Sequence, residues 1–157
     1  MNELTRDESF MAQALLEAGL AQKHGDVPVG AVVVCDGDIV GRGHNRREVD
    51  ADPIAHAEIL AIREAARERG TWYLDGAQIF VTLEPCAMCA GAIVLSRIAR
   101  VVYGTDDPKA GACGGVLDIT GDTRLNHQPS VVGGVMREEC SELIRNFFRG
   151  LRAGGNI

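Results

Sequence analysis

The chain has 157 residues, of which 46% are hydrophobic and 24% are charged, and its formal net charge is −6. This length and composition are typical of a water-soluble globular protein, so we expect one domain spanning residues 1–157. The polar N-terminal stretch predicts no signal peptide, no apolar run is long enough for a membrane span, and the negative charge disfavours nucleic-acid binding outside local basic clusters.

The first third of the chain predicts a helix followed by a hairpin. Apolar residues such as Met11 and Ala14 recur at helical spacing over residues 7–23, and His24-Gly25 ends that helix. Residues 29–35 are rich in valine and predict a buried strand. Asp36-Gly37 is a hairpin signal, so residues 39–45 are expected to form the return strand.

The rest of the chain predicts alternating helices and strands. Asp52 is suited to cap a helix over residues 53–69, with Pro53 at its first position and Gly70 after its end. Strands are expected at residues 78–83, 100–104 and 131–132, and helices at residues 85–96 and 136–151. Residues 105–129 are rich in glycine and aspartate and predict a long loop, which in a compact domain usually has a function.

This order of elements predicts a three-layer α/β/α fold, with a mixed five-stranded sheet and helices on both faces. The first two strands form an antiparallel hairpin, and the later ones follow helical crossovers. Ligands bind in such folds beyond the carboxyl ends of strands, where the crossover helices begin.

Both crossover helices begin at a chemical motif. The first is His56-Ala57-Glu58 and the second is Pro85-Cys86-Ala87-Met88-Cys89. One histidine and two cysteines supply three zinc ligands and leave a fourth position for water, as in catalytic rather than structural zinc sites. Cys86 and Cys89 share a helix face, whereas His56 and Glu58 can converge only at a helix start. A redox pair or a structural zinc site is the alternative, but no second CxxC completes four ligands.

The joint motif predicts a zinc-dependent deaminase. Its spacing is the H-x-E and P-C-x-x-C signature of enzymes that deaminate nucleobases. Zinc acidifies a water molecule. Glu58 need not bind the metal, and it can transfer protons from the water to a ring nitrogen and to the leaving ammonia. Five cysteines, two of them in this motif, favour a reduced, cytoplasmic protein.

Residues 82–92 resemble bacterial tRNA-specific adenosine deaminases of the cytidine deaminase-like superfamily. Residues 27–32, 43–46, 55–58, 101–104 and 107–112 match further segments of that family. The resemblance implies the superfamily fold, one Zn²⁺ per subunit, no organic cofactor and a homodimer. It also implies deamination of adenosine to inosine at the wobble position of a tRNA anticodon loop.

The resemblance also implies substrate contacts by Asn45 and Asp107, and Ala57 and Phe148 are expected to contact the substrate as well. The amide of Asn45 can both donate to and accept from a purine edge, although a turn residue is the alternative. Asp107 can accept from a ribose 2′-hydroxyl, or it can cap its own loop. Phe147 and Phe148 could stack on an unpaired base or pack the last helix. Basic side chains at the RNA are expected from Lys109, Arg145, Arg149 and Arg152, with Arg97 and Arg100 forming a second cluster beside Lys109.

The helix predicted to begin at Pro85 is apolar on every face from residue 87 to residue 95. One face can cover the sheet, and the other predicts a homodimer unless neighbouring helices cover it. A free-base or nucleotide deaminase for guanine or cytosine would use the same zinc site, and a riboflavin-pathway deaminase would usually carry a reductase domain. A zinc-binding module without activity would lack Glu58.

Overall fold

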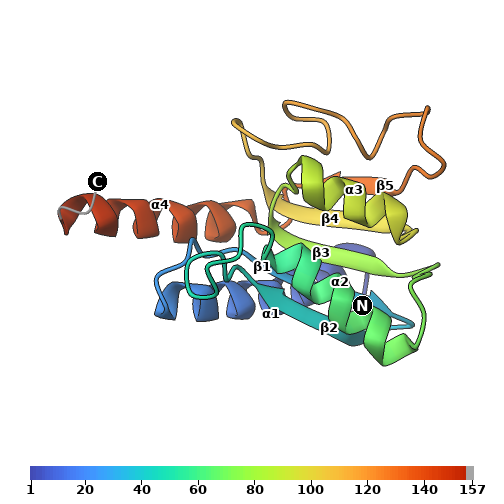
Figure 1. Ribbon diagram of the computed structural model, residues 1–157, viewed down its shortest axis with the longest axis horizontal. Helices are drawn as coiled ribbons and strands as arrows, with labels where there is room; N and C mark the ends of the chain where they lie inside the picture. The colour runs from blue at the N-terminus through green and yellow to red at the C-terminus, as the bar shows by residue number, and fades with distance from the viewer. Residues whose placement is uncertain (155–157) are drawn as a thin grey trace.

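The computed structural model describes residues 1–154 and consists of a sheet with helices on both of its faces (Figure 1). The helices are α1 (Glu3–Lys23), α2 (Ala57–Arg69), α3 (Ala87–Leu95) and α4 (Arg137–Ala153). The strands are β1 (Gly30–Cys35), β2 (Asp38–His44), β3 (Gln78–Leu83), β4 (Arg100–Thr105) and β5 (Ser130–Gly133).

The five strands form one mixed sheet in the order β2-β1-β3-β4-β5. β1 pairs antiparallel with both β2 and β3, while β3, β4 and β5 are parallel to one another. Helical crossovers precede β3 and β4, whereas β5 follows a long loop, and the carboxyl ends of the three parallel strands meet at one edge of the sheet. The predicted three-layer α/β/α fold with five strands is confirmed.

Two apolar layers hold the helices against the sheet. On one face, small residues of α2 such as Ala61 and Ala65 pack on Val33 and Ile79, together with Ile93 of α3. On the other face, Met11 and Ala14 of α1 and Cys140 of α4 pack on Val32, Phe80 and Val102. The alternation of Val32 and Val33 between the two layers is what a strand buried on both faces requires.

Helix α2 begins four residues later than the sequence predicts. Asp52 caps no helix start: its carboxylate accepts a hydrogen bond from the backbone N–H of Ile54 at 3.0 Å, which makes a local turn. His56 takes the N-cap position instead, with extended backbone angles. The helix runs from Ala57 to Arg69, and Gly70 follows it with a left-handed backbone conformation. The shift places His56 and Glu58 on either side of the helix start.

A glycine in β2 lets this helix start approach the sheet closely. A Cβ atom at Gly43 would overlap the carbonyl oxygen of Ala57 and lie 2.7 Å from the backbone nitrogen of Ala61. Only glycine therefore allows α2 to lie this near to β2. The contact brings the His56 motif beside Asn45, which follows the last residue of β2.

Residues 106–129 form the predicted long loop, with one isolated β-bridge between Cys113 and Asp118. Helix α4 follows this loop and β5, and it projects beyond the ends of the strands (Figure 1). No helix formed by residues 1–154 combines the length and the apolar character that crossing a membrane requires.

Candidate active site

The three predicted zinc ligands converge beyond the carboxyl end of β3. His56 is the N-cap residue of α2 and Cys86 is the N-cap residue of α3, and neither side chain caps its own helix. The Nδ1 atom of His56 lies 3.6 Å from Sγ of Cys86 and 3.5 Å from Sγ of Cys89. Both side chains are therefore free to face a shared ligand between the two helix starts.

These distances fit one zinc ion. A tetrahedral zinc with sulfur at about 2.3 Å and nitrogen at about 2.0–2.1 Å holds those atoms about 3.5–3.6 Å apart. All three candidate ligand atoms lie within 4.8 Å of one another, and these three residues are the only such group found among residues 1–154. The group is compatible with one zinc ion per chain and leaves one coordination position to a non-protein ligand.

The electrostatics of the group favour a metal cation. A hydrogen bond from Cys89 lowers the pKa of the Cys86 thiol to about 3. The same hydrogen bond and burial raise the pKa of Cys89, and the contact with Cys86 raises the pKa of His56. Two sulfurs and an imidazole in contact thus share protons that a divalent cation would replace.

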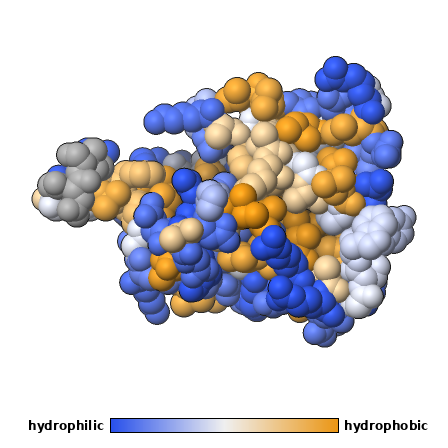
Figure 2. Space-filling view, in the orientation of Figure 1, coloured by the Kyte–Doolittle hydropathy of each residue, from blue (hydrophilic) through white to orange (hydrophobic). Residues whose placement is uncertain are grey.

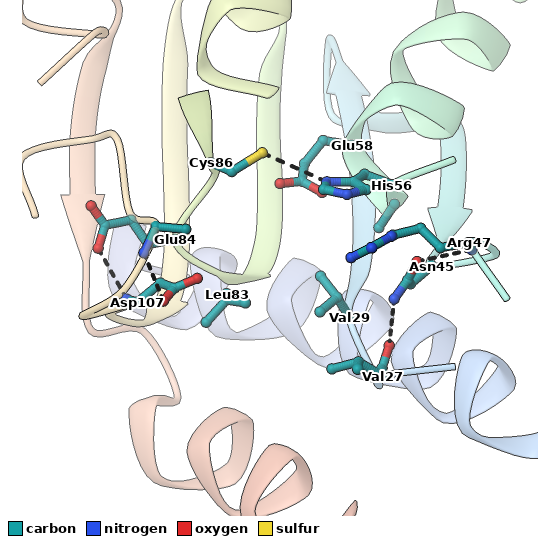
Figure 3. A pocket seen from close by; sticks show the side chains of 12 residues that line it. Val27, Val29, Asn45, Arg47, His56, Glu58, Leu83, Glu84, Cys86 and Asp107 are labelled. Atoms are coloured by element: carbon teal, nitrogen blue, oxygen red, sulfur yellow. Dashed lines mark hydrogen bonds between the residues drawn. The ribbon is translucent and has the colours of Figure 1, made fainter. Parts of the chain in front are cut away.

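Glu58 lies in the first turn of α2, beside the ligand group but not part of it. It is only 4% exposed, and its side chain lines the same cleft as those of His56 and Cys86 (Figure 3). Burial raises the pKa of Glu58 to about 7, which suits a carboxyl group that must both accept and donate a proton near neutral pH.

A cleft with a volume of about 210 Å³ opens above this group. Asn45 and Ala57 lie on its wall, while Cys89 is buried beneath it. The amide of Asn45 donates to the carbonyl oxygen of Val27 at 3.2 Å and accepts from the N–H of Arg47 at 3.2 Å. One N–H and one lone pair of the amide remain available for a ligand.

Asp107 forms the opposite wall of the cleft. Its Oδ1 atom accepts hydrogen bonds from the backbone N–H groups of Lys109 and Ala110, at 3.0 and 3.2 Å. The residue thus caps its own loop, and it lines the cleft as well. The structure thus shows the capping role that the sequence offered, and the second carboxylate oxygen takes no part in the cap.

Six residues that the sequence prediction did not include as site residues also line the cleft: Val27, Val29, Arg47, Leu83, Glu84 and Ala110. Arg47 lies two residues after Asn45, and this second arginine of the Asn45-Arg46-Arg47 run is the signal that could have identified it. Val29 directly precedes β1, and Leu83 is the last residue of β3. Only the pairing of β1 with β3 reveals that these two apolar residues meet. Glu84 was visible as an acid beside the Pro85-Cys86 motif.

A groove leads from the cleft along α4. The two hollows share Val27, Leu83 and Asp107, and the groove continues past Phe148. Phe147 is buried, with 8% of its surface exposed, whereas Phe148 is 38% exposed. Of the two aromatic residues, only Phe148 is therefore accessible to a ligand. The basic side chains along the groove are those of Lys109, Arg145, Arg149 and Arg152.

The second basic cluster that the sequence suggested does not exist. Arg100 lies at the far end of the sheet, where both of its terminal nitrogens bind Asp7, at 2.8 and 2.7 Å. Arg97 donates to the carbonyl oxygen of Val94 at 2.8 Å. Neither arginine lies near Lys109, because Arg97 and Arg100 are just before or at the start of β4 and Lys109 is in the loop that follows its end.

Comparison with known proteins places these features in a family. Residues 4–105 match the family model described as the cytidine and deoxycytidylate deaminase zinc-binding region. The chain is 51% identical over 149 residues to the tRNA-specific adenosine deaminase of Bacillus subtilis, covering 95% of this chain and 92% of that protein.

Solved structures resemble the chain over most of its length. One, from work on A-to-I editing by tRNA:A34 deaminases at the wobble position of transfer RNA, superposes with a TM-score of 0.83 and 43% identity. The superposition covers 86% of this chain and 98% of the other chain. Guanine deaminase from Bacillus subtilis superposes with a TM-score of 0.62 and 36% identity, over 76% of this chain and 74% of that one.

Proposed function

The chain belongs to the cytidine and deoxycytidylate deaminase family, and from this premise we propose that it deaminates adenosine to inosine at the wobble position of a tRNA anticodon. The observation that carries the choice of an RNA substrate is the groove that continues from the catalytic cleft along α4. A free base would fill the cleft alone, whereas a base within a loop needs space for its neighbours.

The candidate site residues divide into ligands and a proton carrier. We assign zinc binding to His56, Cys86 and Cys89, since their atoms are spaced as one zinc ion requires. Zinc, when bound, supplies a Lewis acid that brings the pKa of water near neutrality. No other group of histidines, cysteines and acids among residues 1–154 offers such a set.

Glu58 is the general acid and base of this proposal. It accepts a proton from water as the water oxygen bonds to the ring carbon that carries the amine, and it passes that proton to the adjacent ring nitrogen. It then takes the second proton of the attacking oxygen to the amine, the carbon–nitrogen bond breaks, and ammonia leaves a carbonyl behind. The burial of Glu58 beside the zinc ligands keeps its carboxyl group within reach of the ring nitrogen and of the leaving amine.

The cleft walls supply the contacts to the base and to its neighbour. The free N–H and lone pair of the Asn45 amide can pair with a purine edge, and Ala57 offers its backbone N–H in the first turn of α2. Asp107 can accept from a ribose hydroxyl with the oxygen that its loop does not use. Phe148, exposed in the groove, can stack on an unpaired base.

We further propose a homodimer that forms through α3. Ile93 and Val94 of this helix are buried within the chain, but Leu95 is 70% exposed, and Ala87 is exposed as well. Figure 2 shows apolar residues gathered over the part of the surface where α3 lies. A second copy of the chain would cover this face. A tRNA substrate and five free cysteines support a cytoplasmic location.

An inosine assay tests the proposal. Purified zinc-loaded protein is incubated with an anticodon stem-loop that carries adenosine at the wobble position, and in parallel with free adenine, guanine, cytosine and cytidine. We expect inosine in the stem-loop and negligible turnover of the free compounds. Efficient turnover of guanine or cytosine without inosine in RNA would instead support the free-base alternative.

A further inference from the structure

A second buried glutamate, Glu84, lies between β3 and the Pro85-Cys86 motif and has no part in the reaction described above. The residue is 2% exposed, and none of the ion pairs among residues 1–154 includes it. A buried carboxylate without a cation is costly unless hydrogen bonds replace its water. The partners of Glu84 therefore indicate why an acid occupies this position.

Three backbone N–H groups of one loop converge on this carboxylate. Oε1 accepts from the N–H of Asp107 at 3.1 Å, and Oε2 accepts from those of Cys113 and Gly115 at 3.1 and 3.0 Å. The loop closes tightly around the acid: a Cβ atom at Gly111 would overlap the carboxylate, and one at Gly115 would lie 2.8 Å from Oε2. Residues 107–115 are thus folded around Glu84.

The same loop forms one wall of the catalytic cleft. Asp107 and Ala110 line the cleft, and the Oδ1 atom of Asp107 is fixed by the N–H groups of Lys109 and Ala110. The backbone of Asp107 is in turn fixed by Glu84, as the hydrogen bond in Figure 3 shows. The position of the Asp107 carboxylate in the cleft therefore depends on Glu84 through two successive sets of hydrogen bonds.

We propose that Glu84 is a positioning residue that holds residues 107–115 in place and so determines how well Asp107 meets the nucleotide beside the target base. The inference rests on the proposed function for its substrate. Three N–H donors require a group that only accepts, which a carboxylate is and an amide is not. Glu84 therefore differs in role from Glu58, which exchanges protons with the substrate.

The variant Glu84→Gln tests this role, because it keeps the size of the side chain and turns an N–H₂ group toward at least one of the three donors. We expect the KM for the anticodon stem-loop to rise at least ~10-fold while kcat falls less than ~3-fold, as for lost positioning of a contact rather than lost chemistry. Zinc content by elemental analysis should stay at the wild-type level. Amide hydrogen exchange at residues 107, 113 and 115 should lose its protection.

Two further variants keep the test decisive if Glu84→Gln folds poorly. Gly115→Ala keeps Glu84 in the sequence, but the added methyl group displaces its carboxylate. This variant should give the same rise in KM with little change in kcat. Asp7→Asn removes another buried carboxylate, the partner of Arg100 at the far end of the sheet, and should lower stability without changing KM.

A double-mutant cycle with Asp107→Ala completes the design. If Glu84 acts through Asp107, the double variant should have a KM close to that of Asp107→Ala alone. Additive effects, an unchanged KM in both Glu84→Gln and Gly115→Ala, or a kcat that falls as much as KM rises would overturn the proposal. A wild-type protein that forms no inosine would refute the proposed function instead, while hydrogen exchange would still show whether Glu84 anchors the loop.

Discussion

His56 and Cys86 each occupy the residue before the first turn of a helix, and this position determines what their neighbours can do. Glu58 and Cys89 fall in the first turns of α2 and α3, so each motif presents two side chains toward the same space. The positive ends of both helix dipoles also point there, which stabilises thiolates and other anions. Two short motifs thereby supply all four groups that the proposed chemistry uses.

Replacing Glu58 with Gln should remove the proton carrier and leave the zinc ligands intact. We expect deamination of the anticodon stem-loop to fall by at least ~10²-fold, the usual contribution of a general acid–base group. Zinc should remain at about one ion per chain, because Glu58 is not among the three ligand residues. Turnover rates and elemental analysis of the same samples give both values.

Glu64→Gln is the matched control, since Glu64 lies on the same helix but is exposed and outside the cleft. It should keep wild-type activity. A Glu58→Gln variant that retains more than about one tenth of the wild-type rate would show that another group carries the proton.

The metal site could be predicted from residue types and their spacing, whereas Arg47 and Glu84 could not be assigned to the cleft in this way. His56, Cys86 and Cys89 are recognisable because zinc limits the chemistry of its ligands and the spacing of motifs. Arg47 and Glu84 belong to common residue types, and their roles depend on burial and on which loop packs against them. Tertiary contacts of this kind leave no periodic signal in a sequence.

Among the elements, the start of α2 shows where local reasoning fails. Asp52 and Pro53 are good helix-starting residues, yet the chain uses them for a turn and begins the helix at His56. The close contact of Gly43 with Ala57 fixes the start of the helix on the sheet, and this contact involves residues far apart in the sequence. Tertiary packing therefore overrides capping preference here.

Helix α4 offers two adjacent aromatic residues with opposite expected roles. Phe147→Ala should lower the free energy of unfolding by about 3–5 kcal/mol, because this side chain is buried. Phe148→Ala should leave stability nearly unchanged and weaken binding of the stem-loop, since Phe148 lines the groove. Thermal unfolding and binding titrations separate the effects, and equal losses of stability would contradict these assignments.

Helix α3 is the element on which the proposed homodimer depends. Leu95→Glu places a charge on the exposed apolar face, and we expect monomers by light scattering at micromolar protein concentration. Ile93 and Val94 are unsuitable for this test because they are buried within the chain, so a charge there would disrupt the core.

Leu16→Glu on α1 serves as the control, since Leu16 is 64% exposed but lies on the opposite face of the sheet. This variant should remain a dimer. A wild-type protein that is already monomeric, or a Leu95→Glu variant that stays dimeric, would rule out the proposed interface.

At the scale of the whole molecule, charge is distributed unevenly. The net charge is −6, yet the groove along α4 carries Lys109 and three arginines. Binding of the anticodon stem-loop should therefore weaken as salt rises, because each phosphate contact releases counterions. Arg149→Gln should reduce the slope of log K against log salt by about 1, measured by titration at several salt concentrations.

Arg63→Gln removes the same charge from the exposed side of α2, outside the groove, and should leave that slope unchanged. Equal changes for the two variants would mean that the net charge of the protein, rather than the groove, governs binding.

The order of the segments along the chain also determines when each part can form during synthesis. His56, Cys86 and Cys89 have all been made once residue 89 leaves the ribosome, together with the three strands β1, β2 and β3. β5 and α4 follow more than 40 residues later, beginning at Ser130 and Arg137. A nascent chain that folds from its N-terminus can thus capture its metal before the groove for RNA exists.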